Sequence, residues 1–230
     1  MKKDLTNFEQ EIGVKFKDQK TLAQAFVHRS FINENAKSQY EHNERLEFLG
    51  DAVLELSVTD FLFRKYKNKA EGELTAHRAA LVNAVTLSEV AIDLEMNQYL
   101  MLSKGEAKDT GRARQSILAD AFEAVVGVIY LEHGYEVADK FINKYLLSKT
   151  DEVVKRGLLK DAKSKVQEKS QDIYGVTPKY KVVKEVGPDH DKEFVVGIFF
   201  GPEKVAEGTG KSKQEAETDS AQKALIAKGW

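Results

Sequence analysis

Carboxylates are concentrated in two short stretches of this sequence, and both have helical spacing. In the first, Asn43–Asp51, Glu47 and Asp51 are four residues apart and therefore share one face of a helix. In the second, Asp120 and Glu123 are three residues apart and share a face in the same way. Carboxylates brought together from two helices repel and raise one another's pKa, and a divalent cation reverses that penalty. The spacing is therefore suited to a metal site.

A metal site built from these acids would favour Mg²⁺ or Mn²⁺ over zinc, because all its ligands are oxygens. Such ions activate a water and stabilise a leaving oxygen on phosphorus, which is the chemistry of phosphodiester hydrolysis. The alternative is a solvated helix face, since charged side chains are mostly exposed. Leu46, Phe48 and Leu49 crowd the first stretch, however. Apolar residues on nearly all sides predict a buried helix, whose acids need partners.

A di-iron carboxylate protein is another way to use acidic helices. Such proteins normally carry Glu-x-x-His pairs. None of the five histidines has a glutamate three positions before it, so this alternative is disfavoured.

Two helices are expected to position the acids. One starts near Asn43 and runs past Leu62, and the other is capped by Ser116 and stopped by Gly134. Ser116 and Gly127 are small, so they allow another helix or an ion to come close. The expected inward residues are Leu46, Leu49, Val53 and Leu56 on the first helix, and Ile117, Ala121, Phe122, Val125, Val126 and Ile129 on the second.

Proline placement divides the chain. The first 177 residues contain no proline, and all three prolines lie in the last third. Because proline breaks helix interiors, the proline-free part is expected to be mostly helical. We predict a helical domain over residues 1–150, a linker over 151–159 and a small α+β domain over 160–230.

The predicted small domain has the element order α-β-β-β-α. Its segments are, in order, a helix over about Asp161–Tyr174, strands over Lys179–Val186, Glu193–Phe200 and Lys204–Glu207, and a helix over Ser212–Lys228. Ser212 and Glu215 have the spacing of a capping box at the start of the last helix.

Composition limits the class of protein. Hydrophobic residues are 42% and charged residues 31%, which allows a packed core and argues against wholesale disorder. The absence of cysteine excludes disulfides, thiolate zinc sites and cysteine nucleophiles. No stretch is long enough to cross a membrane and no apolar run follows the first lysines, so the expected location is the cytoplasm.

Charge alone does not suggest a nucleic-acid partner. The net charge is −2, whereas nucleic-acid-binding domains are usually basic. Residues 160–230 carry 13 basic and 12 acidic residues, a net charge of +1 that leaves −3 for the rest. Any contact with a nucleic acid must therefore come from locally placed charge.

Three blocks of the sequence resemble the motifs of the ribonuclease III family. Asn43–Asp51 resembles its nine-residue motif, Glu71–Thr75 with Arg78–Asn83 resembles the next block, and Ser116–Ala124 resembles the third. The order is kept over essentially the whole chain, so the signal is strong. The resemblance implies a mainly α endonuclease domain followed by a small α+β double-stranded RNA-binding domain.

The resemblance also assigns roles to the acids. It implies that Glu47, Asp51, Asp120 and Glu123 bind Mg²⁺, for which Mn²⁺ can substitute. Asp51 and Glu123 match the two acids usually treated as essential for chemistry.

Other positions match family positions whose roles are open. Glu44 and Glu71 match acidic positions that contact RNA or the partner subunit, and a surface salt bridge is the alternative for both. Phe48 matches a residue that packs into the other subunit of a dimer, and ordinary core is the alternative. His28 fits a family block, where a structural role is expected in preference to a metal ligand.

The small domain resembles the double-stranded RNA-binding domain, in which the first helix, the loop between the first two strands and the start of the second helix contact RNA. The matching positions are Ser164, Gln167, Glu168 and Gln171 in the helix, His190 in the loop, and Lys211 and Lys213 at the last helix. A solvated polar surface is the alternative for each. Gln214 and Glu215 stand where many family members are basic, so weak, salt-sensitive RNA binding is expected.

The function implied is that of a homodimeric endonuclease acting on double-stranded RNA. Cleavage would leave 5′-phosphate and 3′-hydroxyl ends, and two facing sites in a two-fold dimer would leave short 3′ overhangs. The expected role is processing of rRNA and mRNA precursors. The alternative is a non-catalytic double-stranded RNA-binding scaffold of the same fold, which loss of a metal-binding acid would indicate; none is lost.

Overall fold

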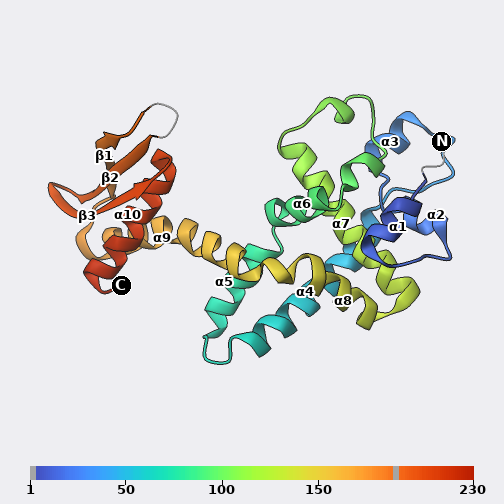
Figure 1. Cartoon of the computed structure of the whole chain (residues 1–230), viewed down its shortest axis with the longest axis horizontal. Coiled ribbons are helices and arrows are strands. Elements are labelled where there is room, and N and C mark those ends of the chain that lie inside the picture. The colour runs from blue at the N-terminus through green and yellow to red at the C-terminus, as the bar shows by residue number, and fades with distance from the viewer. Residues whose placement is uncertain (1–3, 189–191) are drawn as a thin grey trace. The chain divides into compact units, whose positions relative to one another are not determined.

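The computed structural model describes residues 4–188 and 192–230 (Figure 1). The chain forms two units, of which the N-terminal unit ends at Val154 and the C-terminal unit covers Lys155–Trp230. The helices of the N-terminal unit are α1 (Thr6–Ile12), α2 (Gln19–Gln24), α3 (Arg29–Glu34), α4 (Glu44–Lys65), α5 (Glu71–Leu81), α6 (Ala84–Asp93), α7 (Arg112–His133) and α8 (Tyr135–Tyr145), with short 3₁₀ turns at Met96–Tyr99, Glu106–Lys108 and Leu147–Lys149. The next helix, α9 (Thr150–Tyr174), continues into the C-terminal unit, so the expected linker lies within a helix.

The core of the N-terminal unit is built around α7. Its inward residues were predicted correctly, since Ile117, Phe122 and Ile129 are all buried. Gly134 ends the helix as expected, with a φ of 80° that suits glycine. The predicted start was wrong. The helix begins at Arg112, one turn before Ser116, in a stretch of good helix formers.

The other site helix, α4, differs from its prediction on one face. Leu46 and Val53 are buried as expected, but Leu56 is 57% exposed and Phe48 is 81% exposed. The prediction of a helix buried on all sides was therefore wrong. One face of α4 packs against α7, and the opposite face is bare in the single chain.

The C-terminal unit has the expected α-β-β-β-α order. Strands β1 (Lys179–Val186), β2 (Glu193–Phe200) and β3 (Glu203–Gly210) form an antiparallel sheet in the order β1-β2-β3, followed by α10 (Lys213–Lys228). Its small core joins α9, β2 and α10 through Ala162, Val166, Ile198, Phe200, Ala221 and Ala224. The aromatic rings of Phe200 and Trp230 stack at a centroid distance of 5.7 Å.

Strand β3 is three residues longer at its end than its predicted span. The prediction ended early because Gly208 weakens the strand signal in the sequence. The same glycine lets α10 pack on the strand, since a Cβ there would lie 2.1 Å from the backbone nitrogen of Ser220 in α10. Within the described parts of the chain, no helix is both long and apolar enough to cross a membrane.

Candidate metal centre and RNA-binding surface

Two glycines set the distance between the helices that carry the acids. A Cβ at Gly50 of α4 would lie 1.8 Å from the carbonyl oxygen of Glu123, and a Cβ at Gly127 of α7 would lie 2.3 Å from that of Leu46. The two backbones therefore touch, which any larger residue would prevent. The expectation that Gly127 lets another helix approach is confirmed. Gly50 was not singled out in the sequence, although it lies within the nine-residue motif.

The close approach brings acids from both helices into one small space. Carboxylate oxygens of Glu47, Asp120 and Glu123 all lie within 4.8 Å of one another. These three side chains are half-buried, whereas Asp51 is exposed. Asp51 is outside this group of three, but it is close enough for its charge to act on Glu123 and Glu47. We call Glu47, Asp51, Asp120 and Glu123 the acid cluster.

The acid cluster is electrostatically unfavourable without a cation. Burial, followed by the charges of Asp51, Asp120 and Glu47, raises the pKa of Glu123 to about 8. Burial and then the charges of Asp120, Glu44 and Asp51 raise the pKa of Glu47 to about 6. A nearby +2 charge would stabilise the ionised forms. The donors are all oxygens, the ligand type that hard divalent cations prefer.

Glu44 lies beside the acid cluster, forms an ion pair with Arg29 and lies close to the ring of His42. Its Oε1 is 3.3 Å from Nη1 of Arg29, and its Oε2 is 3.7 Å from Nδ1 of His42. The salt-bridge alternative for Glu44 is therefore present in the structure. Arg29 was not singled out in the sequence, because thirteen residues separate it from the motif that contains Glu44.

Glu71 and Phe48 lie outside the group of three acids. Glu71 is the first residue of α5 and accepts a 3.4 Å hydrogen bond from the hydroxyl of Thr75. It lines a hollow of about 240 Å³ whose apolar wall is Leu62, Phe63 and Leu74. The exposure of Phe48 argues against the core alternative for that residue within one chain.

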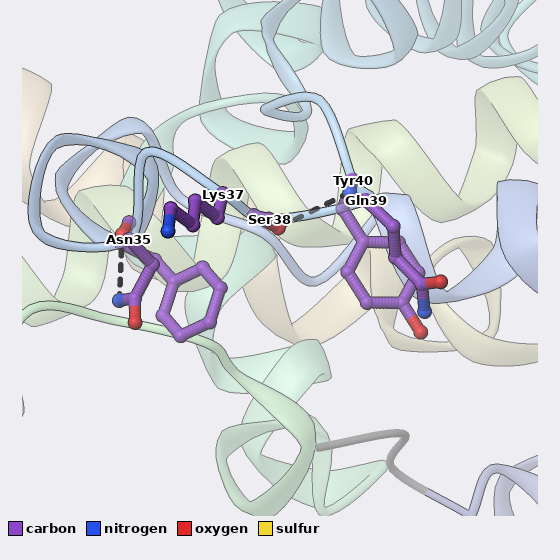
Figure 2. A pocket seen from close by; sticks show the side chains of 6 residues that line it. Asn35, Lys37, Ser38, Gln39 and Tyr40 are labelled. Carbon is purple, nitrogen blue, oxygen red and sulfur yellow. Dashed lines mark hydrogen bonds between the residues drawn. The ribbon is translucent and has the colours of Figure 1, made fainter.

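A further hollow, of about 380 Å³, lies in the segment between α3 and α4 (Figure 2). It is lined by Phe31, Asn35, Lys37, Ser38, Gln39 and Tyr40. Hydrogen bonds from Asn35 Nδ2 to the Phe31 carbonyl, at 2.9 Å, and from the Tyr40 amide to Ser38 Oγ, at 3.1 Å, shape it. No acid of the cluster lines this hollow. His28 caps α3 by accepting from the Ser30 amide, in agreement with its expected structural role.

In the C-terminal unit, the predicted helix residues lie together. Ser164, Gln167, Glu168 and Gln171 line one open hollow of about 380 Å³ on α9. Their donors and acceptors are exposed, as contact with RNA 2′-hydroxyls requires. His190, predicted in the loop between β1 and β2, lies outside the described residues.

Acidic groups surround the start of α10. The Glu215 carboxylate accepts a 2.9 Å hydrogen bond from the Lys211 amide, and the Ser212 hydroxyl accepts one of 3.1 Å from the Glu215 amide. The Asp219 carboxylate accepts from the Thr209 amide at 2.7 Å. Lys213 is exposed, with Nζ 3.9 Å from a carboxylate oxygen of Glu185 on β1. The start of α10 therefore has lysines and backbone amides that can bind phosphate, together with carboxylates that compete with phosphate for them.

Comparisons with known proteins match both units. A family described as Ribonuclease-III-like matches residues 18–150, and one described as Double-stranded RNA binding motif matches residues 162–227. The chain is 44% identical to Ribonuclease 3 of Pelotomaculum thermopropionicum, over 96% of this chain and 92% of that protein. It is 43% identical to Ribonuclease 3 of Bacillus licheniformis, over 95% and 87% respectively.

A solved structure is similar to the N-terminal unit. It is the nuclease domain of ribonuclease III from Campylobacter jejuni, which is 39% identical with a TM-score of 0.57 and covers 63% of this chain and 97% of its own. That structure is described as flexible in a region involved in dimer formation.

Proposed function

The chain belongs to the ribonuclease III family and is a double-strand-specific endoribonuclease, and we propose that Glu47, Asp51, Asp120 and Glu123 form its metal-dependent active site. One observation carries this proposal. Oxygens of Glu47, Asp120 and Glu123, from two different helices, lie within 4.8 Å of one another. Asp51 adds a fourth carboxylate at the exposed edge.

The family requires a divalent metal, and we propose Mg²⁺, with Mn²⁺ as a substitute. Burial and then the charges of the neighbouring acids raise the pKa of Glu123 to about 8, which supports this assignment, because a +2 ion would stabilise the ionised carboxylate. Glu47, Asp120 and Glu123 would hold the ion from the half-buried side, and Asp51 from the exposed side. When bound, such ions supply an activated water and neutralise charge developing on the phosphate.

The residues of the acid cluster then have distinct tasks. Glu123 lies where the two backbones touch, and this close approach brings its carboxylate beside those of Glu47 and Asp120. Asp51 is exposed and can face the RNA as well as an ion. We expect products with 5′-phosphate and 3′-hydroxyl ends, formed during processing of rRNA and mRNA precursors in the cytoplasm.

We assign RNA binding in the C-terminal unit to α9 and to the start of α10. The double-stranded RNA binding motif matched over residues 162–227 supports this assignment. On α9 the proposed contacts are Ser164, Gln167, Glu168 and Gln171, which line one hollow. Lys211 and Lys213 are the proposed phosphate contacts, and the carboxylate of Glu215 opposes them.

We propose that the active form is a homodimer in which a second copy covers the bare face of α4. On this helix, Phe48 is 81% exposed, Leu56 57% and Phe63 70%. An exposed apolar patch of this kind is typical of a surface that binds another protein. The hollow beside Phe63, with its apolar wall and Glu71 at its edge, could receive an aromatic side chain. The similarity to a nuclease domain with a region involved in dimer formation also supports this proposal.

Replacing Glu123 by Gln tests the active site. The substitution keeps the shape but removes a charged ligand, so cleavage in Mg²⁺ should fall by about a thousandfold or more. Binding of long duplex RNA, measured with chelator present, should change little because the C-terminal unit supplies much of it.

The matched control is Glu136→Gln, at an exposed position in the first turn of α8. This variant should cleave at the normal rate. If Glu123→Gln also cleaves at close to the normal rate, the proposed assignment of the acids is wrong.

A further inference from the structure

A negatively charged substrate has to approach an active site that is itself strongly negative. The acid cluster carries four carboxylates, and Glu44 adds a fifth beside them. Divalent ions offset part of this charge, but each phosphate next to the one being cut brings another negative charge. A protein cation at the edge of the acid cluster would lower the cost of this approach.

Arg29 is a cation at that edge. Its Nη1 is 3.3 Å from Oε1 of Glu44. Glu44 is in turn close to the acid cluster, because after burial its charge is the main cause that raises the pKa of Asp120, and it also acts on Glu47. A single ion pair therefore connects Arg29 to the site.

The ion pair leaves Arg29 able to bind a second anion. Its side chain is 67% exposed and that of Glu44 is 45% exposed, so the pair contributes little to stability. A guanidinium has five N–H donors in a fixed plane, and the contact with Glu44 is through Nη1. Donors on the same plane can bind a phosphate in the geometry that arginine favours, while Glu44 keeps the group in place.

We propose that Arg29 binds a backbone phosphate of the RNA strand that lies on the acid cluster, and that Glu44 is the residue that positions it. This inference rests on the proposed function, because it requires RNA at the acid cluster. It assigns to Glu44 a role through Arg29, in addition to its charge near the cluster.

The test measures single-turnover cleavage of a defined duplex RNA in Mg²⁺ by the full chain. Arg29→Ala should lower kcat/KM by about 10- to 100-fold, the loss expected for a hydrogen bond between charged groups. The slope of log kcat/KM against log salt should become shallower by about 1, because one phosphate contact is lost. Arg29→Lys should retain part of the rate, since it keeps the charge but not the planar fork.

A double-mutant cycle with Glu44→Gln separates the proposed contact from a purely structural one. If Arg29 binds phosphate, Arg29→Ala still lowers the rate in the Glu44→Gln background. If Arg29 serves only to hold Glu44, the second substitution has no further effect, and the proposal fails.

Lys140→Ala is the charge-matched control. Lys140 is an exposed cation on α8, a helix that carries neither a residue of the acid cluster nor any of the exposed apolar residues of α4. An equal loss in Lys140→Ala would show a general charge effect and overturn the proposal. Failure of the wild-type chain to cleave would instead refute the proposed function. An unchanged melting temperature for Arg29→Ala, expected for so exposed a residue, would show that the loss is not one of folding.

Discussion

In the proposed active site, we expect the protonation of Glu123 to link metal binding to pH. Its pKa of about 8 in the metal-free protein means that the carboxyl keeps its proton at neutral pH, and a cation has to displace that proton. The apparent affinity for Mg²⁺ should therefore rise by about tenfold per pH unit and level off above pH 8. Calorimetric titration with Mg²⁺ at several pH values measures this. Glu123→Gln should flatten the dependence, and an equally steep dependence in that variant would contradict the assignment.

The same residue affects the stability of the metal-free protein. A carboxyl with a raised pKa stabilises the fold fully below its ordinary value of 4.5, and this contribution is lost as pH rises toward about 8. Saturating Mg²⁺ should oppose the loss, because the cation binds the ionised form of the folded state.

At the scale of the elements, the contact between α4 and α7 is the feature most sensitive to substitution. Gly50→Ala puts a methyl group 1.8 Å from the Glu123 carbonyl oxygen, and backbone cannot move aside cheaply. We expect a loss of about 3 kcal/mol or more in unfolding free energy, together with weaker Mg²⁺ binding. Denaturant unfolding measures the first and calorimetry the second.

Gly72→Ala on α5 is the matched control. A Cβ there meets no heavy atom within 4 Å. Alanine favours the helix over glycine by about 0.5–1 kcal/mol, so this variant should be unchanged or more stable. Equal losses in the two glycine variants would show that the helix contact is not the cause.

The start of α10 offers a substitution that should improve function. Glu215→Gln removes a negative charge from the proposed phosphate site, while its amide oxygen can still accept from the Lys211 amide. Affinity for duplex RNA, measured with chelator at fixed salt, should rise by about two- to fivefold. Glu207→Gln, on β3 and paired with Lys204, is the control for net charge. A fall in affinity for Glu215→Gln, or an equal rise in the control, would contradict the prediction.

Periodicity in the sequence predicted most of these elements but not every face. The strands β1 and β2 agree with the prediction because Gly-Pro pairs mark their ends. The buried residues of α7 agree because its apolar residues recur at helical spacing. Leu56 was misassigned to the interior, and for Phe48 the sequence left both a dimer contact and ordinary core open, since an apolar residue shows the same pattern whether it faces its own core or another chain. The pairing of Arg29 with Glu44 could not be read from the sequence, because it depends on how the segment between α3 and α4 folds back.

At the scale of the whole molecule, the proposed active site gives each chain one acid cluster, which we expect to cut one strand. Cutting both strands in one encounter requires two clusters, which a two-fold dimer supplies. A heterodimer of one wild-type and one Asp51→Asn subunit should therefore nick duplex RNA. Denaturing and native gels of the same reaction distinguish nicks from double-strand breaks. Double-strand breaks at the wild-type frequency would show that one cluster serves both strands.

The stack of Trp230 on Phe200 makes the two units spectroscopically distinguishable. The sequence has one tryptophan, and it packs at the end of α10 against the small core of the C-terminal unit. Its fluorescence therefore reports on the unfolding of that unit alone, whereas circular dichroism at helical wavelengths is dominated by the N-terminal unit. Coincident transitions by the two signals would mean that the units unfold together, and separate transitions that each has its own stability. The protein thus has a built-in optical label for its RNA-binding part, and no dye needs to be attached.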